Sequence, residues 1–137
     1  MKVKDAMHRG AHCLDDDTPL AEVARRMRDA DVGAIPISAA GELVGIVTDR
    51  DIACRAVIDG ADIGKMTARD VMTRNPACCA PDDDLSDAVR VMEARRIRRL
   101  PVMADGSLIG MLSLGDVSSQ ADDAMSAEVL RAVATHH

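Results

Sequence analysis

The chain has 137 residues, a length typical of one domain, and its 47% hydrophobic and 29% charged residues are typical of a folded globular protein. The net charge of −6 argues against general affinity for nucleic acid or for anionic membranes. Because neither a signal peptide nor an apolar run long enough for a membrane span is present, we expect a cytoplasmic protein that binds no membrane and no nucleic acid.

The first predicted elements are a short strand near 12–14 and a helix that follows it. Thr18 is a good N-cap for this helix, and Pro19 is suited to its first turn. Apolar residues then recur at helical spacing and predict one buried face. The members of this face are Leu20, Val23, Ala24 and Met27.

A β-hairpin and a second helix come next. The hairpin is predicted by two apolar runs, 32–37 and 43–47, which flank a turn that contains a glycine. After the second run, Thr48 or Asp49 caps a helix that extends to about Ile58. One copy of the pattern is therefore strand, helix, hairpin and helix.

The same order recurs after a shift of 65 residues, which aligns Asp5 to Asp51 with the second half without a gap. Fourteen positions coincide, whereas typical residue frequencies give roughly three or four by chance. The coincident pairs include Asp5/Asp70, Cys13/Cys78, Pro36/Pro101, Gly45/Gly110 and Asp51/Asp116. The chain is therefore a duplication of one unit.

The second copy predicts the same elements. Asp83 aligns with Thr18 as the helix cap, and the runs 100–103 and 108–112 form the second hairpin, after which Ser113 begins the last helix of the repeat. The buried face of the first helix in this copy consists of Leu85, Ala88, Val89 and Met92.

We expect a mixed α/β (α+β) fold with two β-α-β-β-α repeats. Since one repeat alone has a marginal core, the two should pack their sheets together about a pseudo-twofold axis. The predicted boundaries are 1–58 for repeat 1, 59–67 for a linker, 68–120 for repeat 2, and 121–137 for a C-terminal helix and tail. In that last helix, Val129, Leu130 and Val133 recur at helical spacing, which favours packing against the repeat or dimerisation.

The four cysteines form no CxxC pair, so small buried thiols are the favoured interpretation. His8, His12 and Cys13 lie close in sequence and suit zinc chemically, but a fourth ligand of obvious spacing is missing, so we predict no metal site. No aromatic residue is present, so a bound base would have to be held without aromatic stacking.

Each hairpin ends in Gly-x-x-[Ser/Thr]-x-x-Asp, at 45–51 and again at 110–116. These motifs, the Asp-x-Met openings at 5–7 and 70–72, and the aliphatic-Pro-aliphatic strands resemble a tandem pair of cystathionine-β-synthase (CBS) domains. The resemblance covers the chain to about residue 120. It implies a non-catalytic regulatory module that binds an adenine nucleotide in the cleft between repeats and associates into a disk-like homodimer.

Four motif residues are the candidate ligand contacts. Asp51 and Asp116 suit the ribose diol because a carboxylate accepts two hydrogen bonds. Thr48 and Ser113 suit the phosphate side of the nucleotide. The alternative is purely structural, since a Ser or Thr N-cap followed by an acid in the first turn is an ordinary helix start.

The two copies differ before the Pro-containing strand, where copy two has Arg98 and Arg99 and copy one has Gly33 and Ala34. The resemblance implies that these arginines reach phosphates held at Thr48 and Asp51 of the other repeat, which would make that site the stronger one. The alternative is an arginine-rich helix end that is merely solvated. Ala34 is a candidate contact for the ligand of the site formed by Ser113 and Asp116. Ile35 is a candidate contact for adenine.

The predicted function is a sensor of AMP, ADP or ATP that signals through its dimer to an unidentified partner protein and needs no cofactor. A ligand-free dimeric scaffold, and binding of S-adenosylmethionine or NAD, are the alternatives. Catalysis is not predicted, because no nucleophile elbow, HExxH motif or P-loop is present.

Overall fold

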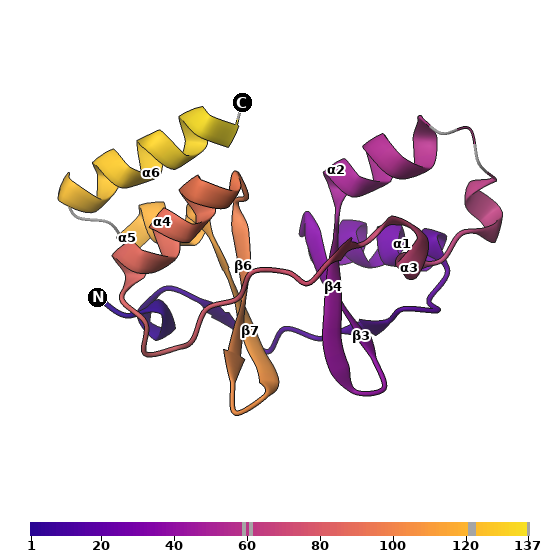
Figure 1. Cartoon of the computed structure of the whole chain (residues 1–137), viewed down its shortest axis with the longest axis horizontal. Coiled ribbons are helices and arrows are strands. Elements are labelled where there is room, and N and C mark those ends of the chain that lie inside the picture. Colours follow the sequence, from indigo (N-terminus) through magenta and orange to yellow (C-terminus); the bar gives the residue numbers. More distant parts are fainter. Residues whose placement is uncertain (59, 61, 121–122, 137) are drawn as a thin grey trace. The chain divides into compact units, whose positions relative to one another are not determined.

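The computed structural model describes the chain except residues 59, 61, 121–122 and 137, and for 123–126 and 135–136 it describes the backbone alone (Figure 1). Helices and strands alternate in both halves. The α-helices are α1 (Leu20–Ala30), α2 (Asp49–Asp51), α3 (Ala68–Val71), α4 (Leu85–Arg95), α5 (Leu114–Gln120) and α6 (Asp123–His136). The 3-10 helices are η1 (Val3–Asp5) and η3 (Ile63–Lys65), and η2 (Ile52–Val57) is a π-helix that continues α2. The strands are β1 (His8–Arg9), β2 (Leu14–Asp15), β3 (Ala34–Ala39), β4 (Glu42–Thr48), β5 (Thr73–Arg74), β6 (Arg99–Ala104) and β7 (Ser107–Ser113).

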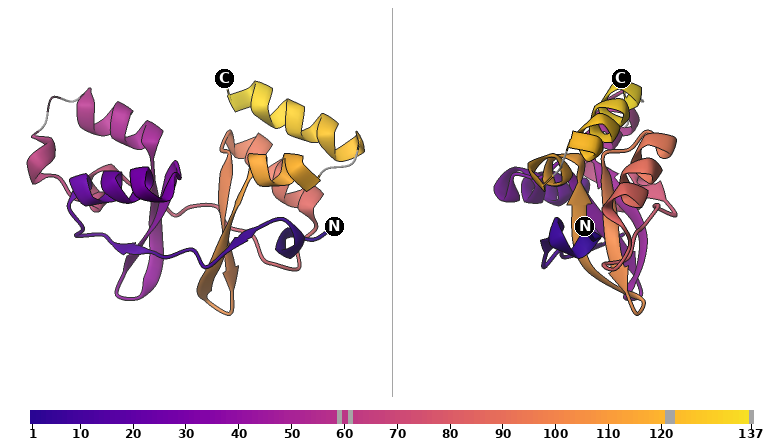
Figure 2. Two further views of the ribbon diagram at one scale, coloured as in Figure 1. Left: turned by 180° about the vertical axis from the view of Figure 1, so that it is seen from behind. Right: turned by 90° about the vertical axis from the view of Figure 1, so that its left-hand side faces the viewer.

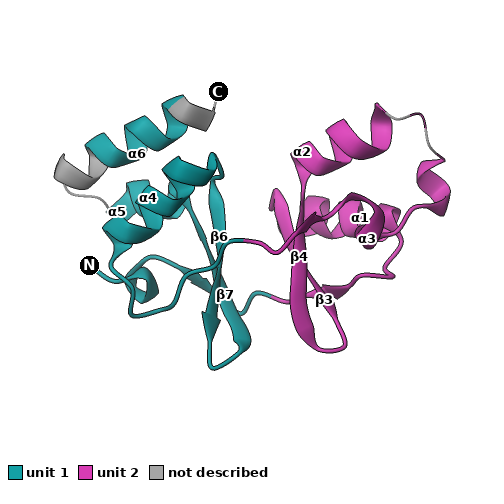
Figure 3. Cartoon of the chain, viewed as in Figure 1, with its two compact units in different colours: residues 1–11, 77–137 teal, residues 12–76 magenta. Residues whose placement is uncertain are grey.

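The chain forms two compact units whose boundaries differ from those of the repeats (Figure 3). Unit 1 contains residues 1–11 and 77–137, and unit 2 contains residues 12–76. The opening segment of each repeat therefore belongs to the unit built by the other repeat. The predicted linker, 59–67, contains η3, while its residues 59 and 61 lie outside the described part.

Unit 2 is a four-stranded sheet in the order β2-β3-β4-β5. The hairpin β3–β4 is antiparallel, β2 runs parallel to β3, and β5 from the opening of repeat 2 pairs with β4. Helix α1 packs its apolar face on this sheet. The core consists of Leu20, Val23, Met27, Ile35, Ile37, Val47, Ala56, Ala68, Val71 and Met72.

Unit 1 repeats this plan with a three-stranded sheet in the order β1-β7-β6. Strand β1, from the opening of repeat 1, pairs with β7, and Cys79 makes a parallel bridge to Val102 in the place where unit 2 has β2. Helix α6 lies along α4 (Figures 1 and 2). Its Val129 and Ala132 belong to the core of the unit, so the C-terminal helix packs back on its repeat.

The mixed α/β class, both hairpins and the two helices of each repeat are confirmed. The start of the first helix is wrong by one residue in each copy, because Pro19 and Asp84 stand at the N-cap positions. The carbonyl of Thr18 instead accepts a hydrogen bond from the Ala68 N–H, and the carboxylate of Asp83 accepts one from the Ala80 N–H. Thr18 thus joins the turn before α1 to α3, and Asp83 stabilises the turn before α4.

Two predicted core positions are exposed. Ala24 on α1 is exposed, although Val89, which follows the same pattern on α4, is fully buried. The difference arises because α6 packs against α4 in unit 1. On α6 itself Leu130 is 70% exposed, so the helix buries Val129 and Ala132 and directs Leu130 away from the repeat.

Candidate functional site

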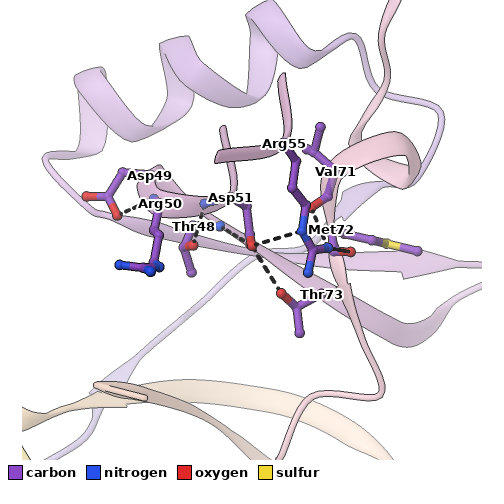
Figure 4. Close-up of polar contacts among 8 residues, drawn as sticks. All are labelled: Thr48, Asp49, Arg50, Asp51, Arg55, Val71, Met72 and Thr73. Carbon is purple, nitrogen blue, oxygen red and sulfur yellow. Dashed lines mark hydrogen bonds and ion pairs between the residues drawn. The ribbon is translucent and has the colours of Figure 1, made fainter. Parts of the chain in front are cut away.

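The motif of the first repeat closes a capping box at the start of α2 (Figure 4). The Asp51 N–H donates to the hydroxyl of Thr48 at 3.1 Å, and the Thr48 N–H donates to Oδ2 of Asp51 at 2.9 Å. Each side chain thus satisfies a main-chain donor that the first helical turn leaves unpaired. Thr48, rather than Asp49, is the cap.

Asp51 also binds groups that sequence analysis did not find. The hydroxyl of Thr73 donates to the Asp51 carboxylate, at 3.2 Å from Oδ1 and 3.4 Å from Oδ2. The Nε of Arg55 lies 3.9 Å from Oδ1, while Nη1 donates to the carbonyls of Val71 and Met72. Asp51 is consequently only 8% exposed and is surrounded by donors.

The second motif builds the same arrangement in unit 1. The Ser113 N–H donates to Oδ2 of Asp116 at 3.0 Å, and the Asp116 N–H donates to the hydroxyl of Ser113 at 3.1 Å. The place of Thr73 is taken by His8, whose Nε2 lies 2.7 Å from Oδ1 of Asp116. In both units, therefore, one carboxylate oxygen is bound by a main-chain N–H and Oδ1 contacts a side chain of the exchanged opening segment.

The glycine that begins each motif makes room for that segment. A Cβ on Gly45 would lie 2.7 Å from the sulfur of Met72, and one on Gly110 would collide with the carbonyl oxygen of His8. The shift of 65 residues does align His8 with Thr73, but nothing in a linear repeat indicates that either would reach the motif of the other copy. This is why sequence analysis missed them.

The family model of the CBS domain matches the chain twice, at residues 3–56 and 68–122. The chain belongs to the CBS domain family. CBS pairs are in general regulatory rather than catalytic modules, and the chain is a regulatory module of this kind.

Stand-alone CBS proteins are among its relatives. The CBS domain-containing protein YhcV of Bacillus subtilis is 36% identical over 116 residues, which cover 85% of this chain and 82% of the relative. Hypoxic response protein 1 of Mycobacterium tuberculosis is 27% identical over 131 residues, 95% of this chain and 92% of the relative.

Two solved structures share the fold. Hypoxic Response Protein I, crystallised with two coordinated zinc ions, has a TM-score of 0.79 and 28% identity over 89% of this chain and 100% of that chain. The CBS domain pair of protein MJ0100, in complex with 5′-methylthioadenosine and S-adenosylmethionine, has a TM-score of 0.79 and 25% identity over 88% of this chain and 94% of that chain.

The remaining predicted contacts of the CBS pair lie on the first hairpin strand of each unit. Ala34 begins β3 opposite Thr48, and Arg99 begins β6 opposite Ser113, with Arg98 immediately before it. Ile35 is 4% exposed and belongs to the core of unit 2. The ligand contacts of these residues, including the reach of the arginines to the other repeat, stay predictions.

Arg98 and Arg99 differ from the other arginines, all of which are exposed. The Arg98 and Arg99 side chains are half-buried, yet among the described residues they have neither a hydrogen-bond nor an ion-pair partner. An unpaired guanidinium group suits an anion, because its planar donors match phosphate or carboxylate oxygens.

The cysteines do not share one environment, so the expectation of four buried thiols is wrong. Cys54 and Cys78 are exposed and Cys13 is half-buried, whereas Cys79 is buried beside the carbonyl of Pro101. Burial raises the pKa of the Cys79 thiol to about 12, which leaves it protonated and unreactive near neutral pH.

The described part of the chain contains neither a metal-binding cluster nor a membrane-spanning helix. No three His, Cys, Asp or Glu side chains come together there as a metal-binding group. Likewise, none of the helices in that part is long and apolar enough to cross a membrane.

Proposed function

We propose that this CBS pair binds an adenine nucleotide of the AMP, ADP or ATP class at its motif carboxylates and reports binding through a homodimer to a partner protein. The ligand would favour one arrangement of the dimer through its higher affinity for that arrangement. The partner protein would then respond to the increased population of that dimer arrangement.

The observation that supports this proposal is the pattern of hydrogen-bond partners at the two motif carboxylates. Oδ2 of Asp51 and of Asp116 is bound by a main-chain N–H, whereas Oδ1 contacts an exchangeable side-chain group, the hydroxyl of Thr73 or the imidazole of His8. A ribose hydroxyl can replace or join such a donor, because an ionised carboxylate has about four acceptor positions.

Two further observations favour an adenosine compound. The MJ0100 pair is seen with 5′-methylthioadenosine and S-adenosylmethionine, both of which carry the adenosine ribose. In this chain, Arg98 and Arg99 supply guanidinium groups without partners among the described residues, which suits the phosphate of a nucleotide better than the uncharged thioether of methylthioadenosine.

A ligand-free scaffold is the second candidate, and the burial of Asp51 favours it. Asp51 already accepts from Thr48 and Thr73 and is 8% exposed, so the capping box and the docked segment explain its presence without a ligand. Binding of S-adenosylmethionine or NAD is a variant of the first proposal, since both contain the same ribose.

Thermal unfolding with AMP, ADP, ATP, NAD and S-adenosylmethionine separates these candidates. A ligand present at 100 times its Kd stabilises the native state by about 2.7 kcal/mol and so raises Tm. The Asp51→Ala and Asp116→Ala variants should each respond less than the wild type. If no ligand raises the Tm of the wild type, the chain is a scaffold.

Asp70→Ala is the matched control for those variants. Asp70 closes a similar capping box, in which the Thr67 N–H donates to Oδ2 at 2.8 Å, but it lies outside both motifs. Its loss should cost a similar capping energy, about 1 kcal/mol, and leave the ligand-induced rise in Tm unchanged. Light scattering should give twice the 14.6 kDa mass of the chain for the homodimer.

A further inference from the structure

The two motif carboxylates have different neighbours at one equivalent position. Strand β5 brings Thr73 to Asp51, and strand β1 brings His8 to Asp116, and the two neighbours are 65 residues apart in the sequence. The surrounding main-chain hydrogen bonds match in both units, so the side-chain neighbours distinguish the two carboxylates chemically. Asp51 also has the Nε of Arg55 at 3.9 Å from Oδ1, beyond hydrogen-bond distance.

Thr73 contacts its carboxylate at longer distances than His8 does. Its hydroxyl is 3.2 and 3.4 Å from the two oxygens of Asp51, so the bond is shared and long. A hydroxyl also has lone pairs, and it can accept from a ribose hydroxyl while it donates to the carboxylate. Thr73 can therefore join a hydrogen-bond network that includes the ligand.

His8 instead occupies one oxygen of its carboxylate. Its Nε2 lies 2.7 Å from Oδ1 of Asp116, and Oδ2 is already bound by the Ser113 N–H. While Nε2 donates to Oδ1, it has no lone pair to accept from a ribose hydroxyl. The ring thus stands where the ribose diol would bind.

The contact is also easy to open. The side chain of His8 is 80% exposed, whereas that of Asp116 is 14% exposed, so the ring can rotate into solvent without unpacking the core. Exposed pairs of this kind contribute little to stability. The contact between His8 and Asp116 would therefore mainly affect a ligand that competes for the same carboxylate oxygen.

We infer that His8 is a positioning residue that competes with ribose for Asp116 and makes the two motif sites of this chain unequal. This inference rests on the proposed function. The apparent affinity of the Asp116 site equals the intrinsic affinity multiplied by the fraction of molecules in which the ring is away from the carboxylate. A ring seated in about nine molecules of ten lowers that affinity about tenfold.

Exchange of the two neighbours tests the inference by calorimetric titration with AMP, and with adenosine as a phosphate-free probe, at one fixed pH. The Asp51→Ala background isolates the Asp116 site, where His8→Thr should bind about three- to tenfold more tightly. The Asp116→Ala background isolates the Asp51 site, where Thr73→His should bind more weakly by a similar factor. His12→Thr, which removes an exposed imidazole in unit 2, is the control and should change neither.

An NMR measurement on the wild type needs only single variants for comparison. The imidazole signals of His8, assigned by their loss in His8→Thr, should shift when AMP saturates the protein and should not shift in Asp116→Ala. If AMP binds but His8→Thr does not change the affinity and AMP does not shift the His8 signals of the wild type, the inference is overturned and the proposed function stands. If AMP and adenosine bind to no form of the protein, the proposed function is overturned with it.

Discussion

Gly45 and Met72 approach so closely that a Cβ on the glycine would lie 2.7 Å from the methionine sulfur. The same Cβ would lie 2.9 Å from the carbonyl oxygen of Thr73. Gly45 is on β4 of repeat 1, and Met72 and Thr73 open repeat 2, so the motif glycine is needed for the exchange of opening segments.

Gly45→Ala should therefore lower the free energy of unfolding by about 1–3 kcal/mol, the usual cost of overpacking. The measurement is urea unfolding. Gly115→Ala is the matched control, because a Cβ there would meet the Ser113 hydroxyl at an ordinary 3.6 Å, and alanine favours the helix. A Gly45→Ala protein as stable as Gly115→Ala would contradict this role of the glycine.

The sequence predicted local structure well because each local signal has a local cause. The Thr48 cap and both hairpins follow from hydrogen-bonding side chains and apolar runs within a few residues of one another. The exchange of opening segments could not be predicted in this way. A repeat shows that His8 and Thr73 are equivalent, but not which copy of the motif each contacts.

The misassigned core positions have the same origin. Helical periodicity identified the apolar side of each helix, but the width of the buried face depends on how many elements pack against it. Val89 is buried because α6 joins α4, whereas Ala24 is exposed at the edge of the buried face of α1. Tertiary packing, rather than the spacing of apolar residues, determines where the buried face of a helix ends.

The C-terminal helix should contribute to the stability of unit 1 through its buried residues alone. Val129→Ala removes apolar contacts in the core and should cost roughly 1–3 kcal/mol. Leu130→Ala, at the adjacent exposed position, should change stability by less than about 0.5 kcal/mol. Urea unfolding of the two variants checks the difference, and equal losses would show that α6 is not docked through Val129.

The turn of the first hairpin places Ala40 in a strained backbone conformation that a substitution can relieve. Ala40 and Gly41 have φ of 52° and 81°, the left-handed values of a two-residue type I′ turn. Alanine is unfavourable there by roughly 1–2 kcal/mol, whereas asparagine tolerates the conformation. Ala40→Asn should therefore raise stability by about 1 kcal/mol in chemical unfolding.

The second hairpin is the natural control for that substitution. Asp105 has φ of 52° in the equivalent turn, where its short polar side chain is already suitable. Asp105→Ala should lower stability by about as much as Ala40→Asn raises it. Changes of the same sign in both variants would refute the turn assignment.

The packing of the opening segment of repeat 1 should be most stable at pH values that are neither acidic nor strongly alkaline. Hydrogen bonds from Lys4 and Lys2 hold the pKa of Asp82 and of Asp84 below the ordinary 3.8, so this stabilisation is present above that pH and is lost as the pH falls through the lowered values. The bond to Asp84 raises the pKa of Lys2 above 10.5, so its contribution is present below that pH and is lost as the pH rises through the raised value.

Amide hydrogen exchange measures this directly, because the Val3 and Lys4 N–H groups donate to the carbonyls of Asp83 and Pro81 at 3.0 Å. After correction for intrinsic rates, protection of both amides should fall below about pH 4 and should also fall in 1 M salt, where the Debye length is about 3 Å. A variant with Lys2→Met and Lys4→Met should lose most of this dependence, since the two carboxylates then lose the lysine hydrogen bonds that lower their pKa most. Protection that varies with pH as strongly in that variant as in the wild type would show that the segment is held by Val3 and the backbone alone.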